Sequence, residues 1–463
     1  MILYSVGLIP DIFALRLTPT GGFFVKTSQT AVSVSIDGKN VKYSGFLSRG
    51  VLVNNLPAGI IAVEVAKEGF ASWRKSIVIE NGLIQEFPYV LLIPEEKNIT
   101  TVSATSSISG IGASPKFFSI NPAGTEFMLA ISQGEKTVFR ILAREGGRDV
   151  IPPLVFVKNG KLLSADWIGS GSSILVHREK DGENFWDIIG ISDKKTSPLI
   201  SPATKVLFNL AASTSPLSKA PRPALTGRQI KRVAENPTGG YYLFDGENIF
   251  DWQEKSTTTT SLISDLEEFQ PLTSNLILIT KRGFLAISDT DGKNVETIDR
   301  PGFFLKGDAF DIKESKAQDI YVVDGAGGLY ILDAESKKIQ PITGAVSETL
   351  FSPDGAKLAY ISGSKLYTLL MVDEKLQPFR KKLANDEVLD ASMPITDFIW
   401  SNKKYSHLIF TTKNGIFITE ADSRFGANTT TLATGQYLIA ASPTDPNGFY
   451  FTDGITVKMM TIE

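Results

Sequence analysis

The chain has 463 residues, which is too many for one ordinary hydrophobic core, so at least two domains are expected. Hydrophobic residues make up 42% of the sequence, the usual share for a globular protein that buries a core. Its 47 Lys and Arg residues nearly balance its 50 Asp and Glu residues, and neither sign forms a long run. A protein that binds nucleic acid normally carries a basic stripe, so no nucleic-acid partner is predicted.

The sequence has no cysteines, which excludes disulfides, thiolate metal sites and a cysteine nucleophile. The 2 histidines, His177 and His407, are too few for a histidine-based metal cluster and are the only candidates for a Ser-His-Asp triad. Neither lies in a hydrolase or metalloprotease motif, so a structural or surface role is predicted for both. No metal and no cofactor is predicted.

Residues 1–19 form an N-terminal segment without a complete signal peptide or membrane span. Met1–Pro10 is apolar but much shorter than the ~20 residues that cross a bilayer. It also lacks a basic region and a small-residue cleavage site. Two interpretations stay open: a buried N-terminal strand, or the outer end of a longer apolar segment that is missing from this sequence.

Residues 20–95 have the pattern of a small β-sandwich. Short strand-like runs follow one another with turns every eight to twelve residues, as is typical of such folds. Asp37–Asn40 is a predicted hairpin turn, because Asp and Gly tolerate the positive φ of tight turns. The predicted strands are Gly22–Thr27, Val32–Ile36, Val51–Leu56, Ile60–Ala66, Trp73–Glu80 and Phe87–Ile93.

This region resembles a PEGA domain, a small β-sandwich of bacterial and archaeal envelope and surface proteins. The four residues that name the family would fall at Gln29–Val32 and do not match its pattern. The downstream turns carry the resemblance, and the matching segments are Val25–Ser28, Ser35–Lys39, Asn54–Gly59, Val63–Phe70 and Trp73–Lys75.

The resemblance implies a cell-envelope protein on the extracytoplasmic side, because a transmembrane helix usually precedes such a domain. Tyr4–Thr20 resembles the linker that follows this helix, so Met1 is expected to be an internal start or truncation point. A membrane anchor absent from this sequence is therefore predicted, with a soluble protein as the alternative.

From residue 116 to the end, one unit of about 40 residues recurs, clearest at Thr349–Met371. Each unit reads as short apolar strands separated by Gly, Asp and Asn turns, and such a period indicates the blades of a β-propeller. Eight blades are predicted, with seven as the alternative. The eight units start near Phe118, Ala165, Lys231, Glu267, Asp308, Glu348, Asp397 and Tyr437.

Residues 96–115 are predicted to be a linker that also supplies a strand. Thr100–Ser114 is rich in Ser, Thr, Gly and Ala, which is typical of linkers. The last repeat unit offers only three strands, so we expect Thr101–Ile108 to pair with it and close the ring. Near residues 208–231, Phe208–Lys231 contains three prolines and no alternation, which indicates an insertion before or within the third blade.

The repeat resembles TolB-type and WD-like propeller units. Phe351–Gly355 (FSPDG), followed by Leu358–Tyr360 (LAY), is the closest copy; the others are degenerate, and no Gly-His…Trp-Asp signature appears. The resemblance implies a propeller fold, and by analogy of fold it also suggests a TolB-like component of an envelope complex.

Three further patterns resemble ligand-binding sites. Asp289–Asn294 begins like a calcium loop but lacks its distal Glu, so a hairpin is favoured. Gly325–Gly328 leads into a strand and not a helix, which excludes a phosphate site of the helix-terminus type. Trp167 and Trp400 occupy the repeat position of Phe351 and are predicted in the core, together with Trp186 and Trp252. Trp73 is the only tryptophan predicted to be exposed.

These observations predict an all-β protein with a non-enzymatic binding or scaffolding role in the envelope, its propeller presenting a face to a protein or glycan. No catalytic, metal-binding or ligand-binding residue is assigned. The competing class is a propeller hydrolase or lyase acting on envelope polysaccharide, for which two carboxylates about 5 to 9 Å apart at the channel mouth would be the mark.

Overall fold

A computed structural model describes most of the chain, and it is all-β as predicted, with one three-residue 3₁₀ turn, η1 (Gly169–Gly171), among the described residues. The chain forms two compact units: residues 1–105 together with 348–463, and residues 106–347. The described residues are 8–11, 16–44, 48–104, 114–133, 135–156, 160–192, 196–200, 207–209, 230–253, 258–298, 305, 310–316, 319–333, 336–401 and 405–462.

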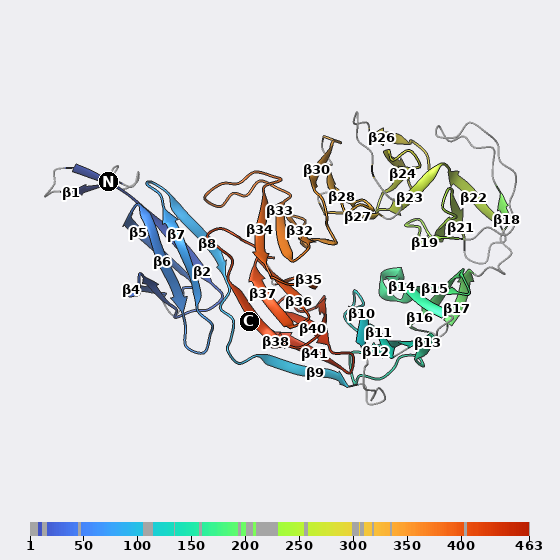
Figure 1. Cartoon of the computed structure of the whole chain (residues 1–463), viewed down its shortest axis with the longest axis horizontal. Coiled ribbons are helices and arrows are strands. Elements are labelled where there is room, and N and C mark those ends of the chain that lie inside the picture. Colours follow the sequence, from blue (N-terminus) through green and yellow to red (C-terminus); the bar gives the residue numbers. More distant parts are fainter. Residues whose placement is uncertain are drawn as a thin grey trace. The chain divides into compact units, whose positions relative to one another are not determined.

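The N-terminal residues of the first unit form two sheets that share one core (Figure 1). One sheet contains β1 (Leu8–Asp11), β2 (Arg16–Thr27), β5 (Gly50–Pro57) and β8 (Ile84–Val90). The other runs in the order β4 (Lys39–Tyr43), β3 (Ser33–Ile36), β6 (Gly59–Ala66) and β7 (Trp73–Ile79). Both sheets contribute buried side chains to the common core, including Phe23, Val53, Val65 and Ile77. The part of these two sheets within residues 16–93, that is, without β1, is called the N-terminal sheet pair below.

The sheet pair differs from the sequence prediction in several strands, and β2 begins at Arg16, six residues before the predicted Gly22. The expected turn at Asp37 and Gly38 is confirmed, with φ of 48° and 78°, but it leads into a strand that was not predicted. This strand, β4, is exposed at all five positions, so it lacks the alternation that reveals a half-buried strand. The last strand, β8, begins at Ile84 and not at Phe87.

Beyond the sheet pair, the described residues form eight sheets, seven of them built on four consecutive antiparallel strands and the last on three consecutive strands with β9. The second unit holds five: β10–β13 (Ser114–Ile120, Glu126–Gln133, Lys136–Ala143, Leu154–Phe156), β14–β17 (Gly160–Ile168, Ser173–Lys180, Glu183–Gly190, Thr196–Ile200), β19–β22 (Arg232–Glu235, Tyr241–Phe244, Ile249–Trp252, Thr258–Ile263), β23–β26 (Leu266–Pro271, Asn275–Thr280, Leu285–Asp289, Glu296–Ile298) and β27–β30 (Asp311–Glu314, Ile320–Val323, Leu329–Leu332, Ile339–Thr343).

The first unit holds the other three of these sheets. They are β31–β34 (Glu348–Phe351, Lys357–Ser362, Lys365–Leu370, Asn385–Asp390), β35–β38 (Ile395–Ser401, His407–Thr412, Gly415–Glu420, Thr429–Thr434) and β39–β41 (Leu438–Ala441, Gly448–Thr452, Thr456–Thr461) with β9 (Asn98–Ala104) as its fourth strand.

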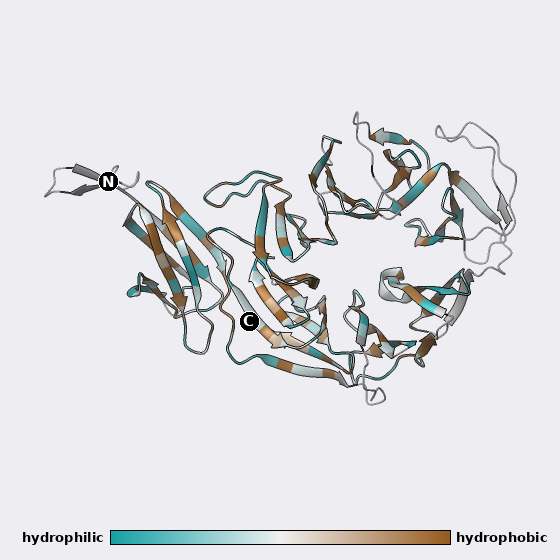
Figure 2. Ribbon diagram, in the orientation of Figure 1, coloured by the Kyte–Doolittle hydropathy of each residue, from teal (hydrophilic) through white to brown (hydrophobic). Residues whose placement is uncertain are grey.

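The predicted eightfold repeat is confirmed at the level of these sheets, because seven of the predicted starts lie at or next to the first strand of a sheet. The remaining start, Asp308, lies outside the described residues, three residues before β27. Strands in the middle of a sheet read as continuous apolar runs since both faces are covered: β24 is buried at five of its six positions and β36 at all six. Figure 2 shows hydrophobic residues concentrated along the strands of these sheets.

The expected pairing between the linker region and the last sheet is also confirmed. β9 runs antiparallel to β41, with Thr100 opposite Met459 and Asn98 opposite Thr461. The strand begins three residues earlier than predicted, and residues 105–108 lie outside the described part of the chain.

The predicted insertion lies mostly outside the described residues. Its first two residues, Phe208 and Asn209, belong to β18 (Leu207–Asn209), which adds a fifth strand to the sheet of β19–β22 by pairing in parallel with β22. Within the described residues, the structure contains no helix long and apolar enough to cross a membrane.

Tryptophans at the equivalent first-strand position connect neighbouring sheets. The indole N–H of Trp400 in β35 donates to the Leu350 carbonyl in β31 at 3.1 Å. Trp167 in β14 donates in the same way to Ser119 Oγ in β10 at 3.0 Å. The predicted core role is confirmed for Trp400, Trp186 and Trp252, which are buried, whereas Trp167 is partly buried.

The motif that best reveals the repeat is a hairpin device. Ser352 Oγ donates to Asp354 Oδ1 and accepts the Lys357 N–H, and the Gly355 N–H donates to the Ser352 carbonyl at 2.7 Å. Gly355 has φ of 75°, a conformation that disfavours a Cβ atom.

We expect Gly355→Ala to lower the free energy of unfolding by about 1 kcal/mol, because alanine is strained at positive φ. Gly344→Ala is the matched control, since no heavy atom lies within 4 Å of a Cβ built at that position. Chemical denaturation of both variants checks this. Equal stability of the two would show that the turn imposes no such restraint.

Candidate functional site

None of the patterns weighed from the sequence forms a ligand site. At Asp289 the Gly292 N–H donates to the Asp289 carbonyl, so the segment is the hairpin that was favoured. In the turn before β29, the Ala326 and Gly328 N–H groups donate to Asp324 Oδ1, which occupies the turn from within. No group of three or more His, Asp or Glu side chains suited to a metal ion occurs in the described part of the chain.

Trp73 corrects the prediction that this tryptophan is exposed: only 3% of it is accessible. Its indole N–H donates to Glu420 Oε1 at 2.6 Å, so it connects the N-terminal sheet pair to the end of β37. Glu420 lies 347 residues further along the chain, and no local pattern around Trp73 could reveal this partner.

Glu420 is the centre of a buried ionic contact within the first unit. Lys75 Nζ lies 3.0 Å from Glu420 Oε2, and their side chains are only 1% and 8% exposed. The Asn428 backbone N–H and side-chain amide also donate to Oε2. Lys75 Nζ donates further to the carbonyls of Asp422 and Arg424. Every charge in this contact therefore has several partners, as burial of an ion pair requires.

A second set of contacts surrounds Phe87 at the same junction. Arg424 pairs with Asp422 at 2.6 Å, donates to the carbonyls of Gln377 and Glu86, and lies over the Phe87 ring. The Glu86 backbone N–H also donates to the Gln377 carbonyl at 3.2 Å. The connections after β33 and β37 thus hold the sheet pair through β7 and β8.

The predicted structural role of His407 is confirmed by its position at this junction. It is 4% exposed and lies opposite Glu420 in the pairing of β36 with β37. Burial lowers the pKa of His407 to about 4; the positive charges of Lys357 and Lys75 act in the same direction, and Glu420 opposes them. The imidazole is therefore neutral at pH 7 and adds no charge to the contact.

Replacing Glu420 with Gln leaves the Lys75 ammonium buried without its counter-ion. We expect the free energy of unfolding to fall by about 3 kcal/mol, as for other broken buried pairs. Glu64→Gln is the matched control, because the Arg74–Glu64 pair lies on the same sheet but is exposed, and it should cost less than about 1 kcal/mol. Chemical denaturation measures both, and similar losses would refute the central role of Glu420.

Asp397, on β35 beside β39, is another ionisable group of the first unit and is partly exposed. Burial raises its pKa to about 7, although backbone N–H groups of Ile439 and Phe398 favour the carboxylate. The folded protein therefore holds a proton at Asp397 between pH 4 and 7 that the unfolded chain releases. It follows that Asp397 makes stability fall as the pH rises through this range.

Asp397→Asn should remove this pH dependence. We expect the variant to match the natural chain at pH 4.5 and to be more stable at pH 8, by on the order of 1–3 kcal/mol. Denaturation curves at the two pH values measure the difference. The exposed hairpin variant Asp181→Asn serves as the control, and a gain at pH 4.5 as large as that at pH 8 would contradict the assignment.

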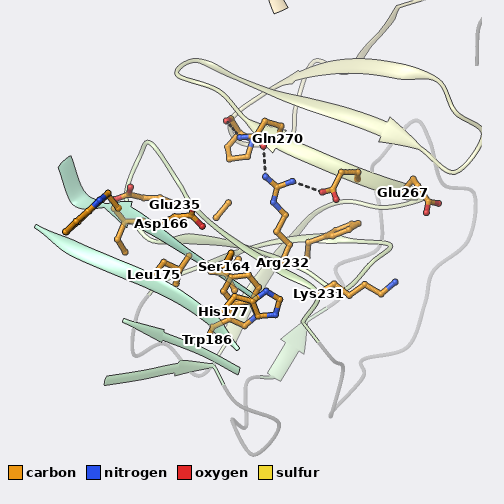
Figure 3. A pocket seen from close by; sticks show the side chains of 17 residues that line it. Ser164, Asp166, Leu175, His177, Trp186, Lys231, Arg232, Glu235, Glu267 and Gln270 are labelled. Atoms are coloured by element: carbon orange, nitrogen blue, oxygen red, sulfur yellow. Dashed lines mark hydrogen bonds and ion pairs between the residues drawn. The ribbon is translucent and has the colours of Figure 1, made fainter. Parts of the chain in front are cut away.

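The second unit contains a cavity of about 800 Å³ that no sequence pattern had indicated (Figure 3). Its volume lies within the range of small-molecule and side-chain sites. The first strands of three successive sheets supply most of its wall: β14 through Ser164 and Asp166, β19 through Arg232 and Glu235, and β23 through Glu267, Glu268 and Gln270.

Arg232 is fixed within the wall of this cavity. Its guanidinium donates to Glu268 Oε1 at 2.8 Å, to the Phe269 carbonyl at 2.6 Å and to Gln270 Oε1 at 2.5 Å, and it lies over the Phe269 ring. Figure 3 shows the side chain reaching from β19 to β23. Arg232 therefore connects two sheets and has its charge matched by Glu268.

An aromatic stack forms another side of the cavity. His177 and Trp186 are directly opposite on β15 and β16, with ring centroids 3.8 Å apart and planes 8° from parallel. His177 Nε2 contacts Asn184 Oδ1 at 3.0 Å. Burial lowers the pKa of His177, with Asn184, Glu179 and Asp166 opposing, so the ring is neutral at pH 7. His177 was predicted to be structural or exposed, and its presence in the cavity wall was missed.

Three of the carboxylates that line the cavity, Asp166, Glu235 and Glu267, have no basic partner among the described residues. Asp166 is exposed to solvent, yet partial burial by the surrounding side chains raises the pKa of its carboxyl, against the effects of Ser164, Arg232 and His177. Glu235 accepts hydrogen bonds from the Gly169 N–H at 3.1 and 3.3 Å. Neither forms an ion pair with a Lys or Arg that the structure describes.

No family model matches the chain, and no curated protein matches it either. Among solved structures it is similar to the one titled "Crystal structure of the computationally designed Ika8 protein: crystal packing No.1 in P63", with 10% sequence identity and a TM-score of 0.44. That match covers 78% of this chain and 99% of the other. A similarity at this level carries no argument about function.

Proposed function

We propose that the chain is a non-enzymatic binding protein of the cell envelope, in which the eight sheets are propeller blades and the N-terminal sheet pair is a PEGA-like sandwich. The eight consecutive antiparallel sheets support the propeller, because such blades normally have four strands each. The strand β9, which completes the last sheet, supports a ring whose ends are joined. The resemblance of residues 20–95 to envelope proteins supports the location.

The cavity of the second unit carries the binding function. It is lined by first strands, which in a propeller face the central channel. Its polar side chains sit on strands, and Arg232 is held by three hydrogen bonds before any ligand arrives. Such prior ordering favours binding, because less side-chain freedom is lost when a partner enters.

The competing enzyme class has one observation in its favour. Ser164, Asp166 and His177 line the same cavity, and these are the residue types of a hydrolytic triad. A triad needs the histidine to bond the serine and the acid. Here Asn184 engages His177 Nε2, and Ser164 bonds Asp166, so among the described residues neither bond is made. A fluorophosphonate probe should therefore leave Ser164 unlabelled.

Filling the cavity should abolish partner binding while leaving the fold intact. We expect Ser164→Trp, which adds bulk to an exposed position in the wall, to lose at least about tenfold in the retention of envelope components on the immobilised protein. Leu163→Trp is the matched control, since Leu163 is exposed on the same strand but does not line the cavity.

Two results would overturn the proposal. The first is equal retention by Ser164→Trp and the natural chain, which would place binding elsewhere. The second is recovery of bound material as cleaved product, with loss of cleavage in Ser164→Ala, which would assign the chain to the hydrolases.

A further inference from the structure

We infer that the cavity selects a positively charged group, the ammonium or guanidinium of a Lys or Arg side chain presented by a protein partner. The inference rests on the proposed binding function and adds the chemical class of the ligand. It stands on the cavity wall formed by β14, β19 and β23 and on the balance of charges within it.

Acidic side chains outnumber basic ones in the described wall of the cavity. Among the described residues, four carboxylates line the cavity, Asp166, Glu235, Glu267 and Glu268, against two permanent cations, Lys231 and Arg232. Glu268 and Arg232 neutralise each other in an ion pair at 2.8 Å. Three carboxylates and one lysine remain, so the cavity has an excess of negative charge that a cationic ligand would balance.

Lys231, the lysine that remains, extends away from the unpaired carboxylates (Figure 3). The Lys231 stem lies against the turn at Gly246, where an added Cβ atom would come within 2.6 Å of its side chain. Figure 3 shows the side chain extending away from Asp166 and Glu235, which point into the cavity from the other side. Lys231 therefore does not supply the missing counter-ion for these two carboxylates.

His177 and Trp186 form an aromatic wall of the cavity. The neutral His177 ring stacked on Trp186 adds an apolar surface beside the carboxylates without adding positive charge. Such a wall suits the methylene stem of a Lys or Arg side chain, whose charged end would then reach Asp166 and Glu235. The Trp186 indole N–H is buried with no acceptor among the described residues, so the wall retains one polar group that is not satisfied internally.

A neutral glycan is less favoured by the same observations. Sugar-binding sites need donors and acceptors for hydroxyl groups, whereas the ordered donors of Arg232 are already occupied by Glu268, Phe269 and Gln270. An anionic ligand would meet uncompensated carboxylates. The charge of the cavity therefore separates the two partner classes that the sequence had left open.

Calorimetric titration of the full chain with capped synthetic peptides tests the inference. The probe is a nine-residue peptide of alternating Lys and Gly; the comparison probes are the same peptide with acetylated lysines and chitotetraose. We expect only the Lys peptide to bind, with affinity that falls as salt rises, because the contact is ionic. Acidification toward the pKa of Asp166, which burial holds above its ordinary value, should weaken binding as this carboxylate gains a proton.

Asp166→Asn and Glu235→Gln should each weaken binding of the Lys peptide by at least about tenfold. Asp291→Asn is the matched control, because Asp291 lies on an exposed hairpin of the same unit and outside the cavity. Thermal melting verifies that each variant is folded. Both replacements, Asn and Gln, keep a side-chain oxygen that accepts hydrogen bonds. A loss of binding therefore results from the loss of the negative charge.

The outcomes distinguish this inference from the proposed function. One outcome is that chitotetraose or the acetylated peptide binds, that Ser164→Trp abolishes this binding, and that Asp166→Asn leaves it unchanged. This outcome would overturn the inference of a cationic ligand and leave the proposed binding function standing. Binding of the Lys peptide that both charge variants retain would also overturn it. Failure of every probe in calorimetry, together with equal retention of envelope components by the natural chain and Ser164→Trp, would overturn both.

Discussion

The ion pair between Lys75 and Glu420 is the constraint on which the first unit depends. Two charges removed from water are unfavourable unless their partners are complete, and here the carboxylate has four donors and the ammonium three acceptors. A shift of β7 against β37 would break several of these contacts together. The pair therefore fixes one orientation of the N-terminal sheet pair on the last sheets, more than it adds net stability.

The path of the chain beyond the sheet pair follows from this anchoring. Leu91 and Ile93, just after β8, are buried in a core that they share with Ile409, Phe451 and other residues of the sheets β35–β38 and β39–β41. The chain then reaches β9 only five residues later, already beside β41. Completion of the last sheet by an N-terminal strand is thus a consequence of where the sheet pair docks, and the docking and the strand pairing reinforce each other.

Sequence reasoning succeeded where the determinants are local. The Ser352–Gly355 turn and the apolar runs of strands such as β24 recur with a period, so the eight sheets could be predicted one by one. It failed at Trp73, although β7 carried a signal: the alternation that buries Ile77 and Ile79 also puts Lys75 on the inner face. A lysine on a core face requires a buried carboxylate. The cavity could not be predicted, because its wall combines side chains from strands far apart in the sequence.

The Glu420 junction and the cavity of the second unit differ in how completely their charges are matched among the described residues. At the Glu420 junction the pairs Lys75–Glu420 and Arg424–Asp422 have both charges matched within the chain, as expected for a contact that only needs to be stable. In the cavity, Asp166 and Glu235 have no ion pair with a Lys or Arg that the structure describes, and the walls make the charged state of Asp166 less favourable. A fold optimised for stability alone would pair or remove such a carboxylate. Its presence on a first strand, beside an Arg232 held by three hydrogen bonds and an aromatic stack, supports the proposal that a partner supplies its counter-charge.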